Sequence, residues 1–310
     1  MTVNVLFALA EERWRDYEAP LRKEIAAIGV EAHIATDIPA DQVDYLVYSP
    51  NSEVQDFTPF TRAKAVLNLW AGVEAVVGNP TLHLPLCRMV DPALTQGMVE
   101  WVTGHILRLH LGMDAHINAP AGTWAPGAPP LSFDTHVTVL GLGELGAACA
   151  TALAGLGFQV TGWSRSQKDI AGITCLSGDA GLDEALAVAD YCVLLLPKTP
   201  ATENTLNART LALMPKGARI LNPGRGPLID DAALLAALDA GHIDHATLDV
   251  FRIEPLPEDD PYWTHPRVTV TPHIASETRP AYSSKTIAEN IRRGEAGEPF
   301  LHLVDRTAGY

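Results

Sequence analysis

The chain is poor in cysteine, and this scarcity excludes a disulfide-rich or zinc-bound scaffold. Four of its 310 residues are cysteines, and they lie far apart without a CxxC pair. Such usage is typical of buried free thiols in a reducing compartment, so we expect a cytoplasmic protein. His242 and His245 lie close in sequence, but no cysteine accompanies them. We interpret this segment as a solvated turn and expect no metal site.

The sequence also lacks long apolar runs and an excess of positive charge. No stretch approaches the ~18 apolar residues that a membrane-spanning helix needs, and the first residues lack the basic region of a signal peptide. The 37 acidic residues outnumber the 22 basic ones, which gives a formal net charge of −15. A field of this sign repels polyanions, so we expect no nucleic acid and no membrane as a partner. A small anionic molecule would need a local cationic site.

What the sequence does contain is an alternation of short β-rich runs and helical patterns. Hydrophobic residues make up 47% of the chain, and its length suffices for two domains of ~100 to 200 residues, each with its own core. The alternation predicts an α/β protein with parallel sheets covered by helices. The predicted strands of the first part lie at 3–9, 30–35, 44–49 and 65–70, with a helix at 11–28.

A long helical pattern and a proline-rich stretch separate this part from a second α/β series. The pattern runs from 91 to 113, and residues 118–130 are too rich in proline and glycine for regular structure. The second series has predicted helices near 183–189 and 204–214 and a terminal helix that ends near residues 294–297. The two parts could therefore form two similar open sheets.

A glycine-rich turn follows the apolar run at 137–140 and leads into a helical pattern. Gly141, Gly143 and Gly146 form a GxGxxG motif, with Glu144 and Leu145 between the last two glycines. The first glycine allows a tight turn, the second lets the backbone approach a pyrophosphate, and the third lets the helix pack on the strand. We therefore expect these five residues to bind a dinucleotide, and a purely structural turn is the alternative.

The end of the next predicted strand bears on which dinucleotide is bound. An NAD site would place Asp or Glu there, about 20 residues beyond the motif. This chain has Ser164, Arg165 and Ser166 instead, followed by Lys168. Hydroxyls and cations suit a 2′-phosphate, so we expect NADP(H) to be preferred, with NAD(H) as a second option. Solvated loop cations are the alternative reading.

Three polar residues come directly after three further predicted strands. Arg225, Glu254 and His273 should converge, because the carboxyl ends of parallel strands line the ligand crevice of an open sheet. Arg225 could pair with a carboxylate, His273 could supply a proton, and Glu254 could orient His273. Taken alone, Arg225 and Glu254 could be surface charges, and His273 could be a core histidine whose hydrogen bonds are made within the protein. Together they predict the reduction of a 2-oxo acid.

Two further places carry candidate ligand contacts. Asp249 precedes Glu254 and could accept a hydrogen bond from a nicotinamide carboxamide, although a buried or capping Asp is the alternative. Trp70, Ala71 and Gly72 lie where a predicted strand gives way to a helical run. Their backbone amides could bind a substrate carboxylate, or the segment could be a structural turn.

With these motifs the chain resembles the D-isomer-specific 2-hydroxyacid dehydrogenase family, and most closely its glyoxylate/hydroxypyruvate reductase A branch. The resemblance extends over nearly the whole chain. It rests on residues 69–73, 88–92, 141–146, 163–166, 196–202, 222–226, 249–251, 254–257, 271–275 and 304–310.

The resemblance implies a Rossmann dinucleotide-binding domain inserted into a flavodoxin-like substrate domain. The expected boundaries are 1–93 and 280–310 for the substrate domain, with a returning C-terminal helix, and 94–279 for the NADP-binding domain. It also implies a homodimer formed through the inserted domain. The helix at 91–113 and the proline-rich arm are the expected contact surfaces.

The resemblance further implies roles for single residues. Arg225, Glu254 and His273 match the family's catalytic residues, and Trp70 to Gly72 match its carboxylate-binding loop. The cofactor contacts match Leu196, Pro197, Thr202, Asn222, Pro223 and Asp249. Tyr48, which we expect to contact the substrate, stands with Ser49 and Pro50 where this branch often has Trp. This departure leaves the preferred substrate side chain open.

The implied activity is NADPH-dependent reduction of glyoxylate to glycolate or of hydroxypyruvate to D-glycerate. A reductase for another 2-oxo acid, such as pyruvate or phenylpyruvate, is one alternative. A second alternative comes from another class of protein, namely a nucleotide-sensing binding protein similar to the C-terminal binding protein co-repressors.

Overall fold

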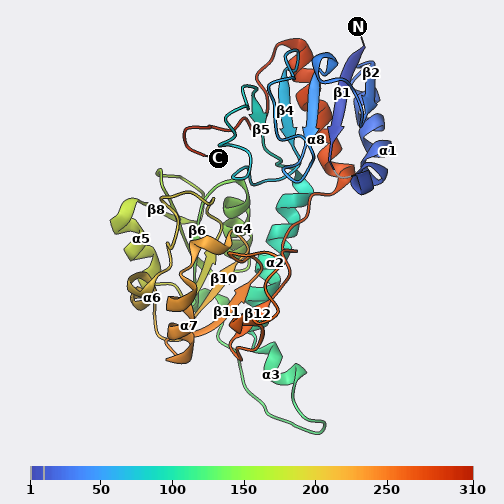
Figure 1. Cartoon of the computed structure of the whole chain (residues 1–310). Helices are drawn as coiled ribbons and strands as arrows, with labels where there is room; N and C mark the ends of the chain where they lie inside the picture. Colours follow the sequence, from blue (N-terminus) through green and yellow to red (C-terminus); the bar gives the residue numbers. More distant parts are fainter. Residues whose placement is uncertain (1, 10, 310) are drawn as a thin grey trace. The chain divides into compact units, whose positions relative to one another are not determined.

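The computed structural model describes residues 2–9 and 11–309, and they form two compact units. The first unit consists of the residues up to Leu94 together with those from Glu277 onward. The second unit is Thr95–Ser276. The chain thus leaves the first unit near the start of one helix and returns to it for the last helix (Figure 1).

The first unit is a parallel sheet of five strands. Its strands are β1 (Val3–Ala8), β2 (Ala32–Ala35), β3 (Tyr45–Tyr48), β4 (Ala65–Asn68) and β5 (Leu86–Cys87), and its helices are α1 (Glu11–Ala27), the short η1 (Ala40–Gln42) and α8 (Pro280–Ala296). The strand order is β2-β1-β3-β4-β5, and every pair is parallel. This is the order of flavodoxin-like sheets.

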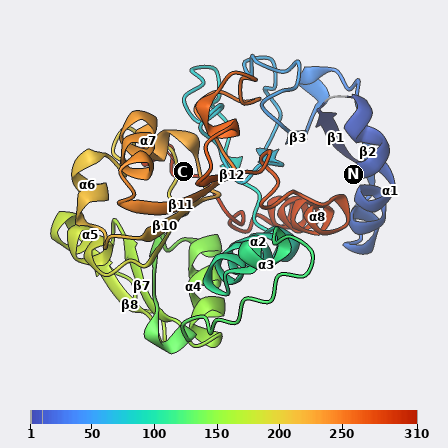
Figure 2. The same ribbon diagram turned by 90° about the horizontal axis from the view of Figure 1, so that it is seen from below.

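Helices cover one face of this sheet, and loops cover the other. Figure 2 shows α1 and α8 side by side, and their apolar residues Leu21 and Ile287 share a core with Phe7 of β1. The opposite face is covered by side chains from the loops, such as Phe57 and Leu82. The last helix therefore completes a core that the first third of the chain begins.

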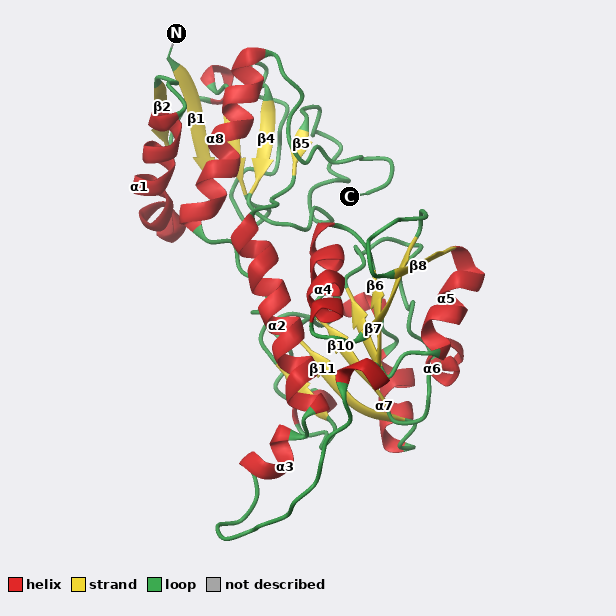
Figure 3. Ribbon diagram, turned by 180° about the vertical axis from the view of Figure 1, so that it is seen from behind, coloured by secondary structure: helices red, strands yellow, loops and turns green. Residues whose placement is uncertain are grey.

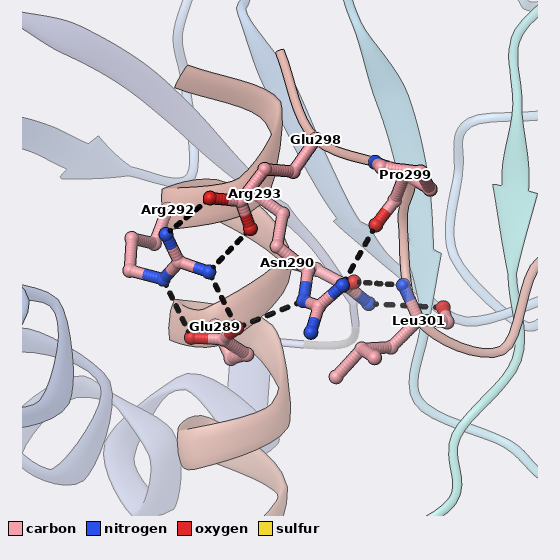
Figure 4. A network of polar contacts seen from close by, with 7 residues as sticks. All are labelled: Glu289, Asn290, Arg292, Arg293, Glu298, Pro299 and Leu301. Atoms are coloured by element: carbon pink, nitrogen blue, oxygen red, sulfur yellow. Dashed lines mark hydrogen bonds and ion pairs between the residues drawn. The ribbon is translucent and has the colours of Figure 1, made fainter. Parts of the chain in front are cut away.

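A polar network fixes the segment that follows α8 (Figure 4). Arg292 donates hydrogen bonds to Glu289 at 2.8 Å and to Glu298 at 2.7 Å. The hydrogen bonds from Arg292 and Arg293 lower the pKa of Glu289 to about 2. Close by, buried Asn290 accepts a hydrogen bond from the Leu301 amide at 2.7 Å and donates one to the Leu301 carbonyl at 3.4 Å. These bonds hold residues 298–301 against the helix.

The second unit is a parallel sheet of seven strands in the order β12-β11-β10-β9-β6-β7-β8. The strands are β6 (His136–Leu140), β7 (Gln159–Ser164), β8 (Thr174–Ser177), β9 (Tyr191–Leu194), β10 (Ala218–Asn222), β11 (Ile243–Leu248) and β12 (Val268–Val270). This is the doubly wound Rossmann order with one additional strand, and it reverses between β6 and β9. The predicted fold class, two open parallel sheets, is confirmed.

Helices cover both faces of the second sheet (Figure 3). One face packs against α2 (Pro92–His110) and α4 (Glu144–Gly155), and the other packs against α5 (Gly178–Ala187), α6 (Ala208–Leu213) and α7 (Asp231–Asp239). The strands are apolar on both sides for this reason, and buried Val139 and Leu140 belong to opposite cores. Short helices η2 (Ser132–Asp134), η3 (Gly226–Leu228) and η4 (Pro261–Trp263) lie in the connections.

The helix expected at 91–113 ends earlier, at His110. Gly112 has a left-handed backbone with φ of 62°, which interrupts the helix, and α3 (Met113–Ile117) follows as a separate turn. As predicted, residues 118–130 form neither helix nor strand, and they extend beyond α3 as an arm (Figure 3). Trp124 in this arm is 92% exposed.

Two other helix boundaries differ from the predicted ones, and two short strands were not predicted. Helix α5 begins at Gly178 and not near 183, and α6 begins only at Ala208. Asn207 caps α6 by accepting hydrogen bonds from the amides of Arg209 and Thr210, which fixes its first turn. The missed strands, β5 and β8, lie at sheet edges and each pair with a single strand, and β5 also forms a bridge with Leu303.

The interpretation of His242 and His245 as a solvated turn was wrong for His245, whereas His242 lies in the turn that precedes β11. His245 lies in β11, and its Nε2 is 2.9 Å from the hydroxyl of Thr269. Burial, assisted by the charge of Arg108, lowers the pKa of His245 to about 4. His242 Nε2 lies 2.9 Å from the Leu211 carbonyl.

The four cysteines are free thiols, and Cys175 is the one that is only partly buried. Within the described residues, no cluster of three or more His, Cys, Asp or Glu is arranged to hold a metal ion. None of the described helices is long and apolar enough to cross a membrane.

Substitution of Gly146 should destabilise the second unit. A Cβ at this position would lie 1.7 Å from the Gly141 carbonyl oxygen, so Gly146→Ala should displace the turn at a cost of about 1 to 3 kcal/mol. Gly155→Ala is the matched control in the same helix, because a Cβ there meets no atom within 4 Å. Thermal unfolding should give a lower Tm for Gly146→Ala alone. Equal Tm values for the two variants would contradict this close approach.

Candidate active site

The candidate residues of the second unit lie in segments at the carboxyl ends of six strands. The glycine motif follows β6, Ser164 ends β7, and residues 196–202 follow β9. Arg225 follows β10, Glu254 follows β11, and His273 follows β12. Because all seven strands are parallel, these segments lie along one edge of the sheet, where open α/β sheets bind ligands.

The glycine motif has the backbone geometry that a pyrophosphate site requires. Gly141 has a φ of 106°, and a Cβ there would lie 2.5 Å from the Leu195 carbonyl oxygen. Gly143 caps the N-terminus of α4, and an added Cβ would meet no protein atom within 4 Å. The backbone is therefore open at the one glycine where a pyrophosphate must approach. These residues fit a dinucleotide.

The loop after β7 exposes a cation and a hydroxyl. Ser164 is buried, and its hydroxyl donates a hydrogen bond to the Ser166 carbonyl at 2.8 Å. The side chains of Arg165 and Ser166 are exposed. Gln167 ties the loop to β8 through a hydrogen bond to the Cys175 carbonyl at 2.9 Å. Ser164 thus shapes the loop, while Arg165 and Ser166 are the residues that could reach a phosphate.

The loop after β9 is held by one of the predicted cofactor contacts. The hydroxyl of Thr202 donates a hydrogen bond to the Pro197 carbonyl at 2.6 Å and accepts one from the Thr199 amide at 2.9 Å. Leu196 is almost fully buried at the start of this loop. Thr202 therefore closes the 197–202 turn by its own hydrogen bonds.

His273 and Glu254 form a hydrogen-bonded pair. The Nδ1 of His273 lies 2.7 Å from Glu254 Oε2, and Glu254 Oε1 accepts a hydrogen bond from the Phe251 amide at 2.8 Å. The hydrogen bond to Glu254 raises the pKa of His273, although burial opposes this shift. Burial alone would raise the pKa of Glu254, but the hydrogen bonds from His273 and Phe251 outweigh it and lower that pKa. The pair therefore favours imidazolium beside carboxylate.

Arg225 lies close enough to act on both members of this pair. Its positive charge lowers the pKa of Glu254 and also that of His273, where it is weaker than the opposing effect of Glu254. The Nη1 of Arg225 donates a hydrogen bond to the Gly224 carbonyl at 2.7 Å. The structure thus brings together the three residues that were expected to converge.

Asp249 holds the turn on which His273 lies. It is fully buried, and its carboxylate accepts hydrogen bonds from the Thr271 hydroxyl at 2.5 Å and from the amides of Ile274 and Ala275, both at 2.9 Å. His273 has a φ of 55°, a left-handed conformation that is rare for residues other than glycine. Asp249 therefore has a clear positioning role, and a direct cofactor contact by its side chain stays a prediction.

In the first unit, the segment 70–72 is shaped by a buried asparagine. Asn68 donates hydrogen bonds from Nδ2 to the Trp70 carbonyl at 2.9 Å and the Gly72 carbonyl at 3.1 Å. Trp70 is 43% exposed, whereas Tyr48 is 1% exposed and packs edge-on against Phe57. Substrate binding by Trp70, Ala71 and Gly72 stays a prediction. The burial of Tyr48 does not favour a substrate contact by its ring.

Sequence reasoning missed Arg252, which joins three of these strand-end segments. It donates hydrogen bonds to the side chain of Asn204 and, at 2.6 Å, to the Ile229 carbonyl, and it forms an ion pair with Asp231 at 3.2 Å. Its partners follow β9 and β10, and Arg252 itself follows β11. The only feature of the sequence that could have indicated this role is the position of Arg252 between Asp249 and Glu254.

A family model and a curated relative match most of this chain. Residues 107–275 match the model of the D-isomer specific 2-hydroxyacid dehydrogenase NAD binding domain. A glyoxylate/hydroxypyruvate reductase A from Yersinia enterocolitica serotype O:8 is 36% identical over 280 residues, which cover 88% of each chain.

Two solved structures are similar over the whole chain. A D-isomer specific 2-hydroxyacid dehydrogenase from Xanthobacter autotrophicus Py2, in complex with NADPH and MES, has a TM-score of 0.93 at 39% identity and full coverage of both chains. An NADPH-dependent glyoxylate/hydroxypyruvate reductase from Sinorhizobium meliloti, in complex with NADP and sulfate, has a TM-score of 0.85 at 36% identity. That match covers 100% of this chain and 99% of the other.

Removal of the negative charge of Glu254 should lower the pKa of His273. Glu254→Gln keeps the size of the side chain, but it removes the negative charge that, through the hydrogen bond to His273, favours imidazolium. NMR titration of the His273 ring should therefore show its transition at lower pH than in the wild type. Glu258→Gln, in the same connection, is the control and should leave the transition unchanged. A transition that does not move in Glu254→Gln would contradict the pairing.

Proposed function

The chain belongs to the D-isomer specific 2-hydroxyacid dehydrogenase family and is therefore an oxidoreductase, and from this premise we propose that it reduces a small 2-oxo acid with NADPH. Glyoxylate and hydroxypyruvate are the proposed substrates, with glycolate and D-glycerate as products. The observation that carries the proposal is the His273–Glu254 pair beside Arg225, at the sheet edge that also holds the glycine motif. Relatives named glyoxylate/hydroxypyruvate reductase support this substrate class.

The proposed cofactor site runs along the glycine motif and the loop after β7. The open backbone at Gly143 suits a pyrophosphate, and exposed Arg165 and Ser166 suit a 2′-phosphate. The similar structures that hold NADPH or NADP support the same choice. When bound, NADPH supplies the hydride that reduces the carbonyl carbon. Contacts by Leu196, Pro197, Thr202 and Pro223 stay predictions.

Arg225 and His273 act on the two functional groups of the substrate, the carboxylate and the carbonyl. The planar guanidinium of Arg225 can bind the carboxylate and polarise the adjacent carbonyl. His273 can donate the proton that the carbonyl oxygen needs as the carbon is reduced, because its Nδ1 side is held by Glu254. Glu254 thus orients the ring and keeps it protonated to higher pH.

We further propose that two copies of the chain form a homodimer through α2 and the arm. In the arm, Trp124 is 92% exposed, and Ile117 in α3 and Phe133 in η2, which flank the arm, are 72% and 59% exposed. Large apolar side chains exposed in this way are typical of protein interfaces. Analytical ultracentrifugation measures the mass of the assembly directly.

The expected cytoplasmic location of the protein stays a prediction.

The purified protein should oxidise NADPH when glyoxylate or hydroxypyruvate is added, with pyruvate and phenylpyruvate as the alternative substrates. The rate should fall as the pH rises through the titration of His273, because the proton donor is then lost. His273→Ala should lower kcat by roughly 10² to 10⁴-fold. Arg225→Lys should lose most activity, because lysine lacks the planar fork that pairs with a carboxylate.

Two outcomes of this assay would overturn the proposal. Near-normal turnover by His273→Ala would remove its role as the proton donor. Tight NADPH binding without turnover of any 2-oxo acid would instead favour the nucleotide-sensing binding protein.

Arg165→Ala should weaken NADPH far more than NADH. A lost charge-assisted contact with the 2′-phosphate costs about 1.5 to 3 kcal/mol, or roughly 10- to 150-fold in Kd, and NADH has no such phosphate. Arg267→Ala, which removes the same charge at the amino end of β12, is the matched control. Titration of nucleotide fluorescence measures both affinities. Equal losses for the two nucleotides would exclude Arg165 as the discriminating residue.

A further inference from the structure

Asn222, the last residue of β10, directs its whole side-chain amide at the loop that carries Arg225. It is 1% exposed. Its Nδ2 donates a hydrogen bond to the Arg225 carbonyl at 2.9 Å, and its Oδ1 accepts one from the Gly224 amide at 3.2 Å. Both ends of the amide are therefore engaged within three residues of the strand end.

This loop is wedged between the ends of the two neighbouring strands. A Cβ at Gly224 would lie 2.7 Å from the Leu194 carbonyl oxygen of β9. A Cβ at Gly226 would lie 2.0 Å from the Phe251 carbonyl carbon, beyond β11. The backbone on both sides of Arg225 is thus pressed against fixed neighbours, and the bond from Asn222 sets the Arg225 peptide between them.

We propose that Asn222 is a positioning residue that acts through Arg225, and not through the nucleotide that the resemblance would assign to it. The inference rests on the proposed function, in which Arg225 binds the substrate carboxylate. The hydrogen bond from Asn222 fixes the carbonyl of Arg225. The orientation of that peptide sets the direction in which the Arg225 side chain leaves the backbone, and therefore where its guanidinium lies. A bidentate pair tolerates little error in this direction, since a shift of ~1 Å at a reacting group can cost ~10²-fold in rate.

The first unit contains a similar arrangement, in which the Nδ2 of a buried asparagine holds a loop, and this supports the assignment. Asn68 is the last residue of β4 and is also 1% exposed. Its Nδ2 donates to the carbonyls of Trp70 and Gly72. In each sheet, a buried asparagine at a strand end holds the backbone of the loop that follows.

The test is Asn222→Asp, with Asn290→Asp as its matched control. Asn290 is equally buried and bonds the amide and carbonyl of Leu301 in the same way, but in α8 of the first unit (Figure 4). Each substitution replaces a donor by an oxygen that faces a carbonyl, so both should lower Tm. Asn222→Asp alone should lower kcat/KM for glyoxylate, by about 10- to 100-fold, with the Kd for NADPH unchanged.

Two results would overturn the inference. A Kd for NADPH that rises by the same factor as kcat/KM falls would make Asn222 a cofactor contact. An equal loss of kcat/KM in Asn290→Asp at equal loss of Tm would reduce the effect to stability. Asn222→Ser removes the same hydrogen bond without adding a carboxyl group, and it serves if Asn222→Asp does not fold.

A crystal structure separates this inference from the proposed function. If Arg225→Lys keeps wild-type kinetics, the proposed role of Arg225 fails. In that case, the crystal structure of Asn222→Ser still tests whether Asn222 positions Arg225. A displaced Arg225 carbonyl and guanidinium support it, and an unchanged loop overturns it.

Discussion

The carboxylate of Asp249 is the point on which the candidate site depends. A buried charge is costly unless hydrogen bonds compensate for its lost hydration, and Asp249 accepts three of them. All three donors belong to the turn after β12, so this side chain joins the ends of β11 and β12 in addition to the backbone hydrogen bonds from Thr271 to Leu248 and from His273 to Asp249. In that turn His273 has a left-handed conformation, and its ring lies within hydrogen-bond distance of Glu254. The hydrogen bonds that compensate this buried charge thus contribute to the geometry of His273 and Glu254.

The same principle recurs around the sheet edge. Asn222, Thr202 and, in the first unit, Asn68 each hydrogen-bond the backbone of the loop in which they lie or which they precede. Loops are ordinarily the mobile parts of an α/β protein. Asn222 and Asn68 end buried strands, so the loop backbone that they hydrogen-bond takes its position from the rigid sheet, whereas Thr202 closes the 197–202 turn from within its own loop. Functional groups that must meet within hydrogen-bond distance require such support.

The sequence predicted those features that depend on local pattern. The apolar strand before Gly141 and the helical pattern after it define the glycine motif, and parallel strand ends make Arg225, Glu254 and His273 converge. Contacts between distant residues could not be predicted in this way. Arg252 reaches Asn204 across 48 residues and Asp249 reaches Ala275 across 26, and neither leaves a local pattern. The burial of His245 likewise depends on tertiary packing.

The charges of the site act against the field of the whole chain. With a net charge of −15, the protein repels an anionic substrate at long range, but screening at physiological salt limits that field to about 8 Å. Within this distance, Arg225 can attract a carboxylate, and it also lowers the pKa of His273. A carboxylate bound to Arg225 would offset this effect, and burial would then remain as the influence that opposes Glu254 and lowers the pKa of His273. On the proposed function, binding of the anion and protonation of His273 would favour each other, and His273 would be charged most fully when the substrate is in place.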